Sequence, residues 1–277
     1  MLGAIAGDII GSIYETIRIK RKDFRLFLPF SFFTDDTVLS VAVADALLGR
    51  KEFGPTIKAY AWRRPFRGYG PRFYRWMLSL GCEPYNSLGN GSAMRVSPVA
   101  YAGASKEEVL QLAALSARCT HNHPEGVKGA QAAALCVYMA RTGSTKDSIR
   151  AAITDAFAYD VSRRLEDIRP TYRMNLTCPG SVPEAIIAFL DSRDFEDAIR
   201  NAVSLGGDAD TQAAISGSIA EAFYGGVPLE IARRVWSKLP ASYQQVILSF
   251  HRRYPIPTDV EQIAGPSGLP PVSQLGR

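Results

Sequence analysis

Residues 34–48 read TDDTVLSVAVADALL, in which two threonines and two aspartates run directly into an apolar segment. Thr34 is a typical helix N-cap, because its side-chain oxygen can accept a hydrogen bond from the free backbone N–H groups of the first turn. Asp35 and Asp36 suit the positive end of a helix dipole. The stretch therefore predicts an apolar helix over residues 38–48 with a negatively charged start.

A second stretch near the other end of the chain has the same design. Residues 206–223 read GGDADTQAAISGSIAEAF, so Asp208, Asp210 and Thr211 precede a segment rich in small residues. The glycines at 206 and 207 permit positive φ and close approach of the backbone to an ion or a ligand. Small residues in the following helix allow neighbouring helices to come close.

The two acidic helix starts predict a site for hard divalent cations, provided that they meet in space. Four carboxylates and two or three hydroxyls supply the oxygen ligands that magnesium and manganese prefer. Without a cation, grouped carboxylates would cost several kcal/mol in repulsion and desolvation. The alternative is that each acid only caps its own helix. That reading is favoured for either cluster alone, and the metal site is favoured for both together.

The rest of the chain favours an all-α fold, because apolar residues recur with helical spacing and alternating strands are hard to find. Ser105 and Glu108 form a capping box. We expect a single domain over residues 1–254 and an irregular tail, rich in proline and glycine, over 255–277. The expected helices cover residues 4–14, 38–48, 105–117, 129–140, 144–158 (capped by Ser144), 182–190, 194–203, 210–223 and 243–250.

Composition narrows the setting in which the protein works. The 277-residue chain carries four scattered cysteines and a formal net charge of +5. No C-x-x-C pair indicates zinc, and no apolar run is long enough to span a membrane. The first residues do not form a signal peptide, so a reduced, cytoplasmic protein is expected.

Residues 62–76 carry much of the positive charge. Five arginines alternate there with aromatic residues. Such a segment can stack bases and bind phosphates. The favoured alternative is a surface helix pair with its aromatic side chains in the core and its arginines in water.

Three further segments carry polar groups that suit a site. Residues 86–95 form a glycine-rich turn before a helix, where free backbone amides can bind phosphate oxygens. Residues 120–125 contain two histidines. We expect His121 to form a hydrogen bond to a ligand or to a neighbouring loop. His123 is equally well explained as the residue that precedes a helix beginning at Pro124. Glu15 closes an apolar helix, where a carboxylate can act as a general acid or base or join a surface ion pair.

Taken together, these segments resemble the ADP-ribosylglycohydrolases. The motifs that carry the resemblance occur in the family's order: residues 7–11 with Glu15, then residues 34–37, 89–95, 120–121 and 207–211. Each motif alone is modest, but five in register are specific. The resemblance covers residues 2 to about 225, and it implies a compact orthogonal bundle of helices around a central cleft with two magnesium or manganese ions.

The resemblance also implies roles for individual residues. It implies metal ligands at Thr34, Asp35, Asp36, Asp208, Asp210 and Thr211. It implies contacts to ADP-ribose at Gly68, Gly70, Ser87, Leu88, Gly89, Asn90, Gly91 and His121. Pro71 departs from the family pattern next to the Gly68–Gly70 loop. We expect Glu15, Asp36 and Asp210 to supply the catalytic carboxylates, with Glu15 matching a residue whose role differs among members.

The expected function is metal-dependent hydrolysis of the C1″ glycosidic bond that joins ADP-ribose to an acceptor. The acceptor could be a protein side chain, a nucleic acid or a small molecule such as O-acetyl-ADP-ribose. Two other functions stay open: a catalytically weak ADP-ribose-binding module, and a metal-dependent phosphohydrolase that would cut a P–O bond of a nucleotide.

Overall fold

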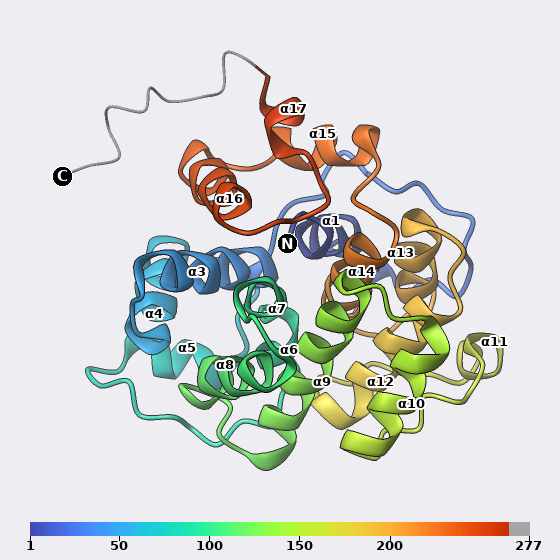
Figure 1. Cartoon of the computed structure of the whole chain (residues 1–277), viewed down its shortest axis with the longest axis horizontal. Coiled ribbons are helices and arrows are strands. Elements are labelled where there is room, and N and C mark those ends of the chain that lie inside the picture. Colours follow the sequence, from blue (N-terminus) through green and yellow to red (C-terminus); the bar gives the residue numbers. More distant parts are fainter. Residues whose placement is uncertain (266–277) are drawn as a thin grey trace.

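The computed structural model describes residues 1–265 of the chain. This part contains 17 helices and no strand, so the prediction of an all-α fold is confirmed. The helices run in several directions and cross one another (Figure 1). In chain order they are α1 (Leu2–Gly11), α2 (Tyr14–Ile17), α3 (Asp35–Gly49), α4 (Phe53–Arg63), α5 (Pro71–Leu78), α6 (Gly91–Met94), α7 (Ser97–Ala102), α8 (Lys106–Arg118), α9 (Pro124–Arg141), α10 (Lys146–Phe157), α11 (Leu165–Ile168), α12 (Cys178–Leu190), α13 (Phe195–Val203), α14 (Ala209–Phe223), α15 (Leu229–Ser237), α16 (Ala241–Arg253) and α17 (Val260–Ala264).

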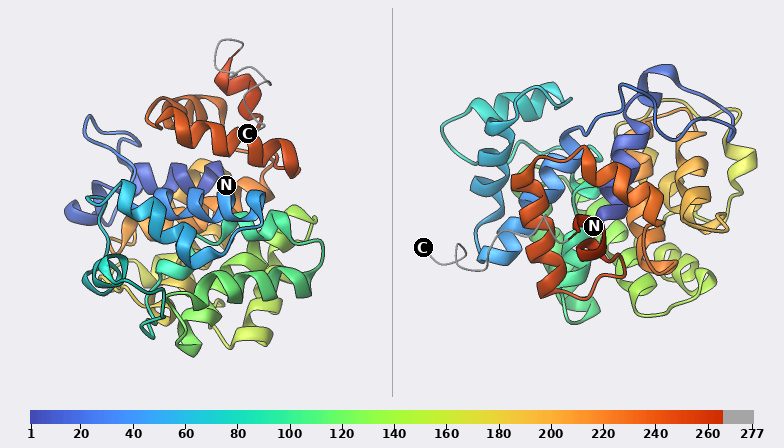
Figure 2. Two further views of the ribbon diagram at one scale, coloured as in Figure 1. Left: turned by 90° about the vertical axis from the view of Figure 1, so that its left-hand side faces the viewer. Right: turned by 90° about the horizontal axis from the view of Figure 1, so that it is seen from above.

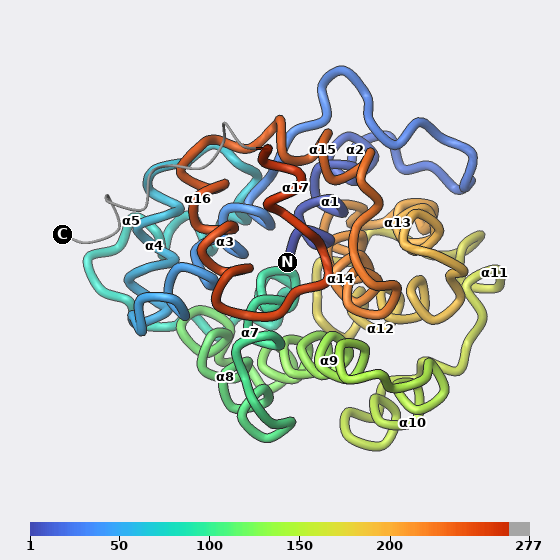
Figure 3. The backbone as a smooth tube through the Cα atoms, turned by 45° about the horizontal axis from the view of Figure 1, so that its top comes forward, coloured from blue at the N-terminus to red at the C-terminus, as the bar shows by residue number. Residues whose placement is uncertain are grey.

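Helix α14 lies at the centre of the molecule. All its residues up to Ala222 are buried, although the segment includes Asp210, Gln212 and Glu221. Helices α1, α9, α12 and α13 pack around it (Figure 3). A helix surrounded on all sides needs small residues and internally satisfied polar groups, which explains the composition of this segment.

Glycines let α1 and α14 approach closely. A Cβ atom at Gly7 would lie 2.5 Å from the backbone nitrogen of Ala214, and one at Gly11 would lie 2.5 Å from the Cα atom of Asp210. A Cβ at Gly3 would lie 3.0 Å from the carbonyl carbon of Gly217. The glycines of α1 therefore form a smooth face that lets the two backbones pack tightly.

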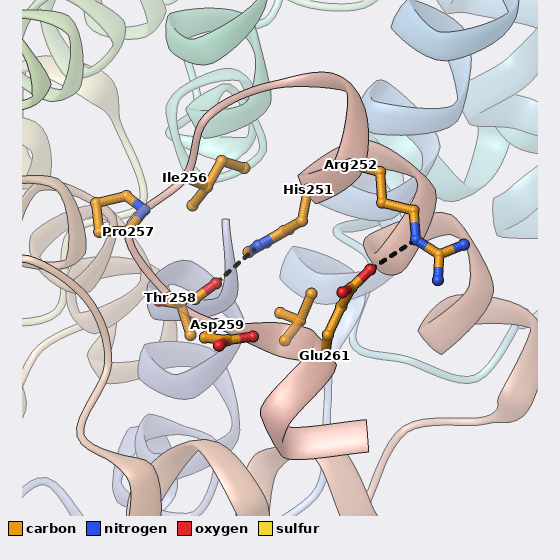
Figure 4. Close-up of a pocket in the computed structure, with 8 residues that line it drawn as sticks. His251, Arg252, Ile256, Pro257, Thr258, Asp259 and Glu261 are labelled. Atoms are coloured by element: carbon orange, nitrogen blue, oxygen red, sulfur yellow. Dashed lines mark hydrogen bonds and ion pairs between the residues drawn. The ribbon is translucent and has the colours of Figure 1, made fainter. Parts of the chain in front are cut away.

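Helices α15, α16 and α17 form a layer against α1 and α3 (Figure 2). The expectation of an irregular tail is wrong for residues 255–265, which pack on the protein and include helix α17. The Thr258 hydroxyl donates to the Glu221 carboxylate at 2.6 Å and accepts from the Val227 backbone amide at 3.0 Å. A pocket of about 370 Å³ lies beside His251 and Arg252, where Arg252 pairs with Glu261 at 2.8 Å (Figure 4). None of the predicted site residues lines it. Residues 266–277 of the expected tail lie outside the described residues.

Most expected helices form, with shifted boundaries. The segment 4–14 ends at Gly11, and α2 then begins a separate turn at Tyr14. Ser105 caps α8 by accepting from the Glu108 amide, as predicted. The prediction that Ser144 caps α10 is wrong, because Thr145 accepts the hydrogen bond from the Ser148 amide instead. No helix within residues 1–265 has both the length and the apolar character needed to cross a bilayer.

The glycine face of α1 gives a stability prediction. We expect Gly7→Ala to lower the free energy of unfolding by about 3 kcal/mol or more, because the new methyl group meets backbone atoms that cannot rotate away. Urea unfolding followed by circular dichroism measures the change.

The matched control is Gly54→Ala in α4. A Cβ there would make ordinary contacts of 3.5 Å with Cys119 and 3.6 Å with Cys82. Alanine also has the higher helix propensity, so we expect no loss and a gain of up to about 1 kcal/mol. Equal effects of the two substitutions would contradict the close backbone contact.

Candidate functional site

Asp8 of α1 holds the start of α3 in place. Its buried carboxylate accepts hydrogen bonds from the backbone amides of Thr34 at 3.0 Å and Thr37 at 3.1 Å. It also accepts from both threonine hydroxyls, that of Thr34 at 2.7 Å. This clamp fixes the direction in which Asp35 and Asp36 project.

Asp8 was not among the predicted site residues. The one feature that could have indicated Asp8 in the sequence is that it is the single acidic residue in the otherwise apolar segment 2–11. A lone acid in a buried helix needs hydrogen-bond donors, but the sequence does not say that another helix start supplies them.

The two acidic helix starts meet in space, as predicted. The Thr211 hydroxyl lies 3.4 Å from Oδ2 of Asp36, and the Thr34 hydroxyl lies 3.4 Å from the same oxygen. Residues 175 positions apart in the sequence therefore share one oxygen cluster. Since the clusters share this contact, the reading in which each acid caps only its own helix is too simple.

A group of three carboxylates lies at the start of α14. One oxygen each from Glu15, Asp208 and Asp210 lies within 4.8 Å of the others. Asp208 and Asp210 are buried, whereas Glu15, from the short helix α2, is half-buried. This spacing suits a shared cation, with Glu15 at the more exposed side.

The pKa values of the carboxylates in the site are raised. Burial raises the pKa of Asp36 well above its ordinary value, and the charges of Asp8 and Asp35 raise it further. Burial likewise raises the pKa of Asp210, with the Asp208 charge as the next cause. The pKa of Glu15 is raised by burial and then by Asp208.

One oxygen of this cluster has no partner. Among the described residues, nothing donates a hydrogen bond to the buried Oδ1 of Asp36. Orphaned buried oxygens are rare in folded proteins and need an explanation. An all-oxygen donor set with surplus negative charge and an unpaired buried oxygen fits a divalent cation of the magnesium or manganese type.

The two glycines before Asp208 have different structural roles. Gly206 has φ +62°, a conformation that favours glycine, as the sequence predicted. Gly207 is needed for a close contact with the ring of Tyr172, because a Cβ atom at Gly207 would lie 3.1 Å from Cδ1 of that ring. The Tyr172 hydroxyl donates to the Gly180 carbonyl at 2.6 Å and accepts from the side-chain amide of Gln212 at 3.0 Å. Tyr172 thus supports the Asp208 loop, a role the sequence analysis did not find.

The glycine-rich turn at residues 86–91 is held by a distant segment. The Asn90 amide donates to the Leu176 carbonyl and the Cys178 amide donates to the Leu88 carbonyl, both at 2.9 Å. The Ser87 hydroxyl accepts from the Gly89 amide at 3.1 Å, so it is used within the turn. The Asn90 side chain donates to the Asp208 carboxylate at 2.5 Å. The turn is therefore tied to the acidic cluster.

The two histidines of residues 120–125 have different places. His121 is buried below the turn, and its Nε2 would lie 3.2 Å from a Cβ atom at Gly91. His123 caps α9 by accepting from the Glu125 amide at 3.1 Å, which confirms the helix-entry reading.

The Gly68–Gly70 loop borders the site on one side only. The Asp35 amide donates to the Arg67 carbonyl at 2.7 Å, and a Cβ atom at Gly68 would lie 3.3 Å from Oδ1 of Asp35. Gly70 precedes α5 and has open space around it. Gly68 is thus beside Asp35, whereas nothing described contacts the open side of Gly70.

Comparison with known proteins finds similarity in both sequence and fold. The family described as ADP-ribosylglycohydrolase matches residues 1–254. The chain is 29% identical to ADP-ribosylhydrolase ARH3 of Gallus gallus, covering 81% of this chain and 84% of that protein. It is 25% identical to ADP-ribosylarginine hydrolase Tri1 of Pseudomonas putida (strain GB-1), covering 86% of this chain and 74% of that protein.

A solved structure also superimposes on this fold. It is titled "ADP-ribosylglycohydrolase-related protein complex" and matches with a TM-score of 0.69 at 27% sequence identity. The match covers 91% of this chain and 96% of that chain.

The raised pKa values of the acids predict a pH-dependent stability. The pKa of Asp8 is raised from 3.8 to about 6, mainly by burial. A raised pKa means that the folded protein keeps a proton which the unfolded chain has lost, so the stability falls as pH rises from about 4 through 6. For Asp8 alone the loss is about 3 kcal/mol. Urea unfolding of metal-stripped protein at pH 5 and pH 8 measures about half of this loss, because at pH 5 part of it has already occurred.

Magnesium is expected to reverse the loss. A cation that binds only the folded, ionised cluster stabilises it by mass action. Magnesium at about a hundredfold above its Kd should add about 2.7 kcal/mol at pH 8 and less at pH 5. Identical unfolding curves at pH 8 with and without magnesium and manganese would contradict the metal assignment.

Proposed function

The chain belongs to the ADP-ribosylglycohydrolase family, and we propose that it hydrolyses the C1″ glycosidic bond between ADP-ribose and an acceptor. The products are free ADP-ribose and the unmodified acceptor. The names of the relatives, ADP-ribosylhydrolase ARH3 and ADP-ribosylarginine hydrolase Tri1, support this reaction class.

One observation carries the proposal. The Asn90 side chain bonds the Asp208 carboxylate at 2.5 Å, which joins the glycine-rich turn to the acidic cluster. The expected free amides are mostly absent from this turn, because those of Asn86, Ser87, Gly89 and Asn90 donate within the protein. A diphosphate bound over the turn would still have its sugar end directed toward the carboxylates. Neither feature alone distinguishes a hydrolase from a simple cation site or phosphate site.

We assign two magnesium or manganese ions to the cluster. The proposed ligands share oxygen side chains and lie on the converging starts of α3 and α14: Thr34, Asp35, Asp36, Asp208, Asp210 and Thr211. When bound, such ions would supply Lewis-acid polarisation of the ribose hydroxyls and of a water molecule.

The protein's own carboxylates handle the proton. Glu15 is half-buried beside Asp208 and Asp210, and its raised pKa favours holding a proton that can pass to the leaving group. Asp36 and Asp210 are deeper and are the candidates to accept the proton of the attacking water. Their negative charges also stabilise the positive charge that develops on the sugar.

We expect Asp35→Ala and Asp210→Ala each to lower turnover at least about 100-fold, since each removes several kcal/mol of charge stabilisation. The fold should survive, because both changes relieve repulsion among the grouped carboxylates. Turnover is measured as release of ADP-ribose in magnesium, and folding by circular dichroism.

Asp45→Ala is the matched control on the same helix as Asp35. Asp45 lies toward the far end of α3, and within residues 1–265 its one ion pair is with Lys51 at 3.0 Å. Its turnover should stay within about twofold of wild type, since exposed ion pairs contribute about 0 to 1 kcal/mol. Wild-type rates in either site variant would refute the metal assignment.

Product identity separates the three candidate functions. Hydrolysis of the glycosidic bond releases ADP-ribose, whereas a phosphohydrolase would release AMP or phosphate. A binding module would bind ADP-ribose in calorimetry without turnover. Chromatography of the products formed from ADP-ribosylated arginine, serine and nucleic acid decides among them.

The charge of the segment around Arg67 and Gly68, which contact Asp35, bears on the acceptor. No acidic residue occurs between Glu52 and Glu83. Five arginines there form what we call the arginine rim: Arg63, Arg64, Arg67, Arg72 and Arg75. Within residues 1–265, none of them pairs with a carboxylate.

The aromatic residues beside the arginine rim fall into two groups. Phe73 and Trp76 are buried, as the helix-pair reading predicted, but Phe66 is 87% exposed. Phe66 directly precedes Arg67, whose carbonyl bonds the Asp35 amide. An unpaired cationic rim with an exposed ring next to the acidic cluster supports an anionic acceptor, and we propose a nucleic-acid end.

Salt dependence tests this acceptor. Binding of a single-stranded oligonucleotide should weaken steeply with salt, and Arg63→Ala/Arg75→Ala should flatten the log–log slope by about 1.4 if both side chains contact phosphate. The control pair, Arg233→Ala/Arg253→Ala, changes exposed arginines outside the arginine rim. Binding without salt dependence, or equal slopes for both pairs, would exclude a nucleic-acid acceptor.

A further inference from the structure

Arg95 is a buried cation without a carboxylate partner. It follows α6, directly after the glycine-rich turn, and its side chain has 0% exposure. One terminal nitrogen donates to the Ser116 carbonyl at 2.8 Å and to the Thr120 hydroxyl at 2.9 Å. Among the described residues, nothing accepts from Nε or from the other terminal nitrogen. Burying an unpaired charge is costly, so the fold retains it at the expense of stability.

The Thr120 hydroxyl connects Arg95 to His121. It lies 2.7 Å from Nδ1 of His121. Because a guanidinium can only donate, the hydroxyl oxygen is the acceptor toward Arg95. Its own proton then needs an acceptor, and within residues 1–265 Nδ1 is the one at hydrogen-bonding distance. Nδ1 is therefore unprotonated, and the ring proton of neutral His121 resides on Nε2.

His121 is held neutral by its surroundings. Burial lowers its pKa well below the ordinary 6.5, and the charges of Arg95 and Arg72 lower it further. A neutral imidazole has one donor and one acceptor, so fixing Nδ1 as the acceptor makes Nε2 a donor.

The free donor points at the turn. Nε2 would lie 3.2 Å from a Cβ atom at Gly91 and 3.5 Å from one at Gly89. No described protein atom accepts a hydrogen bond from it. The absence of side chains at both glycines leaves room on the side that Nε2 faces.

We propose that Arg95 and Thr120 are positioning residues that hold His121 in its Nε2–H tautomer and direct this donor at an anionic oxygen of a nucleoside diphosphate over residues 87–91. The identity of the ligand rests on the proposed function. The tautomer rests only on the hydrogen bonds described above.

Nitrogen NMR of the free protein tests the tautomer. The chain has three histidines, so His123→Asn and His251→Gln variants assign the signals of His121. At pH 7, wild-type Nδ1 should show the shift of an unprotonated nitrogen and Nε2 that of a protonated one. Thr120→Ser should keep this pattern, because the hydroxyl remains. Thr120→Val should populate the Nδ1–H form. A protonated Nδ1 in the wild type would overturn the proposal.

Calorimetry with ADP-ribose tests the consequence for binding. Thr120→Val should weaken binding at least tenfold, whereas Thr120→Ser should stay within about threefold of wild type. Arg95→Met should weaken binding at least as much as Thr120→Val. Thr56→Val is the matched control, since its hydroxyl donates only to the Glu52 carbonyl, at 2.7 Å. Unchanged affinity of Thr120→Val would overturn the proposal.

The two readouts separate this inference from the proposed function. Wild-type protein that fails to bind ADP-ribose would refute the proposed function and the ligand assigned to His121, whatever its tautomer. Wild-type protein that binds ADP-ribose while both Thr120 variants keep wild-type tautomer and affinity would refute the positioning roles alone.

Discussion

The close approach of α1 to α14 is the contact on which the rest of the structure depends. Gly3, Gly7 and Gly11 let the two backbones meet where any side chain would collide. This contact brings the start of α14, with Asp210, against the end of α1. Asp8, one turn earlier on α1, then reaches the start of α3. A single backbone contact thus sets the relative positions of three helices and of both acidic clusters.

The arrangement concentrates negative charge where solvent is scarce. The cluster is tolerated because backbone amides at two helix starts, together with threonine hydroxyls, face the carboxylates. The amides and hydroxyls of Thr34 and Thr37 stabilise the ionised form of Asp8, although burial still raises its pKa to about 6. Asp36 and Asp210 are less well satisfied, and their raised pKa values show the remaining cost. The grouped carboxylates lower the stability of the free protein, and a bound cation and substrate would restore it. Such electrostatic strain is common at functional sites.

The site has two sides of different construction. The acidic side is built from helix starts, and the opposite side is a turn held by residues 176–178 and underlain by His121. The Asn90–Asp208 hydrogen bond connects the two sides, so a shift of the turn would move the Asp208 carboxylate. The buried charge of Arg95 lies on the turn's side, which suits an anion there and a cation across the site. Opposite charges on the two sides would orient a ligand that has a diphosphate at one end and a sugar at the other.

The sequence alone determined the helical fold and the two acidic helix starts, because these follow from the spacing and caps of nearby residues. It also indicated the 86–95 turn and His121. Asp8, Tyr172 and the Leu176–Cys178 support of the turn emerged only from the structure, as did the Arg95–Thr120–His121 chain. Each acts through a partner on another segment, and a hydrogen bond between segments leaves no periodic signal in either one. Whether Asp36 and Thr211 would meet was decided by how closely two backbones could pack, which is a property of the assembled helices.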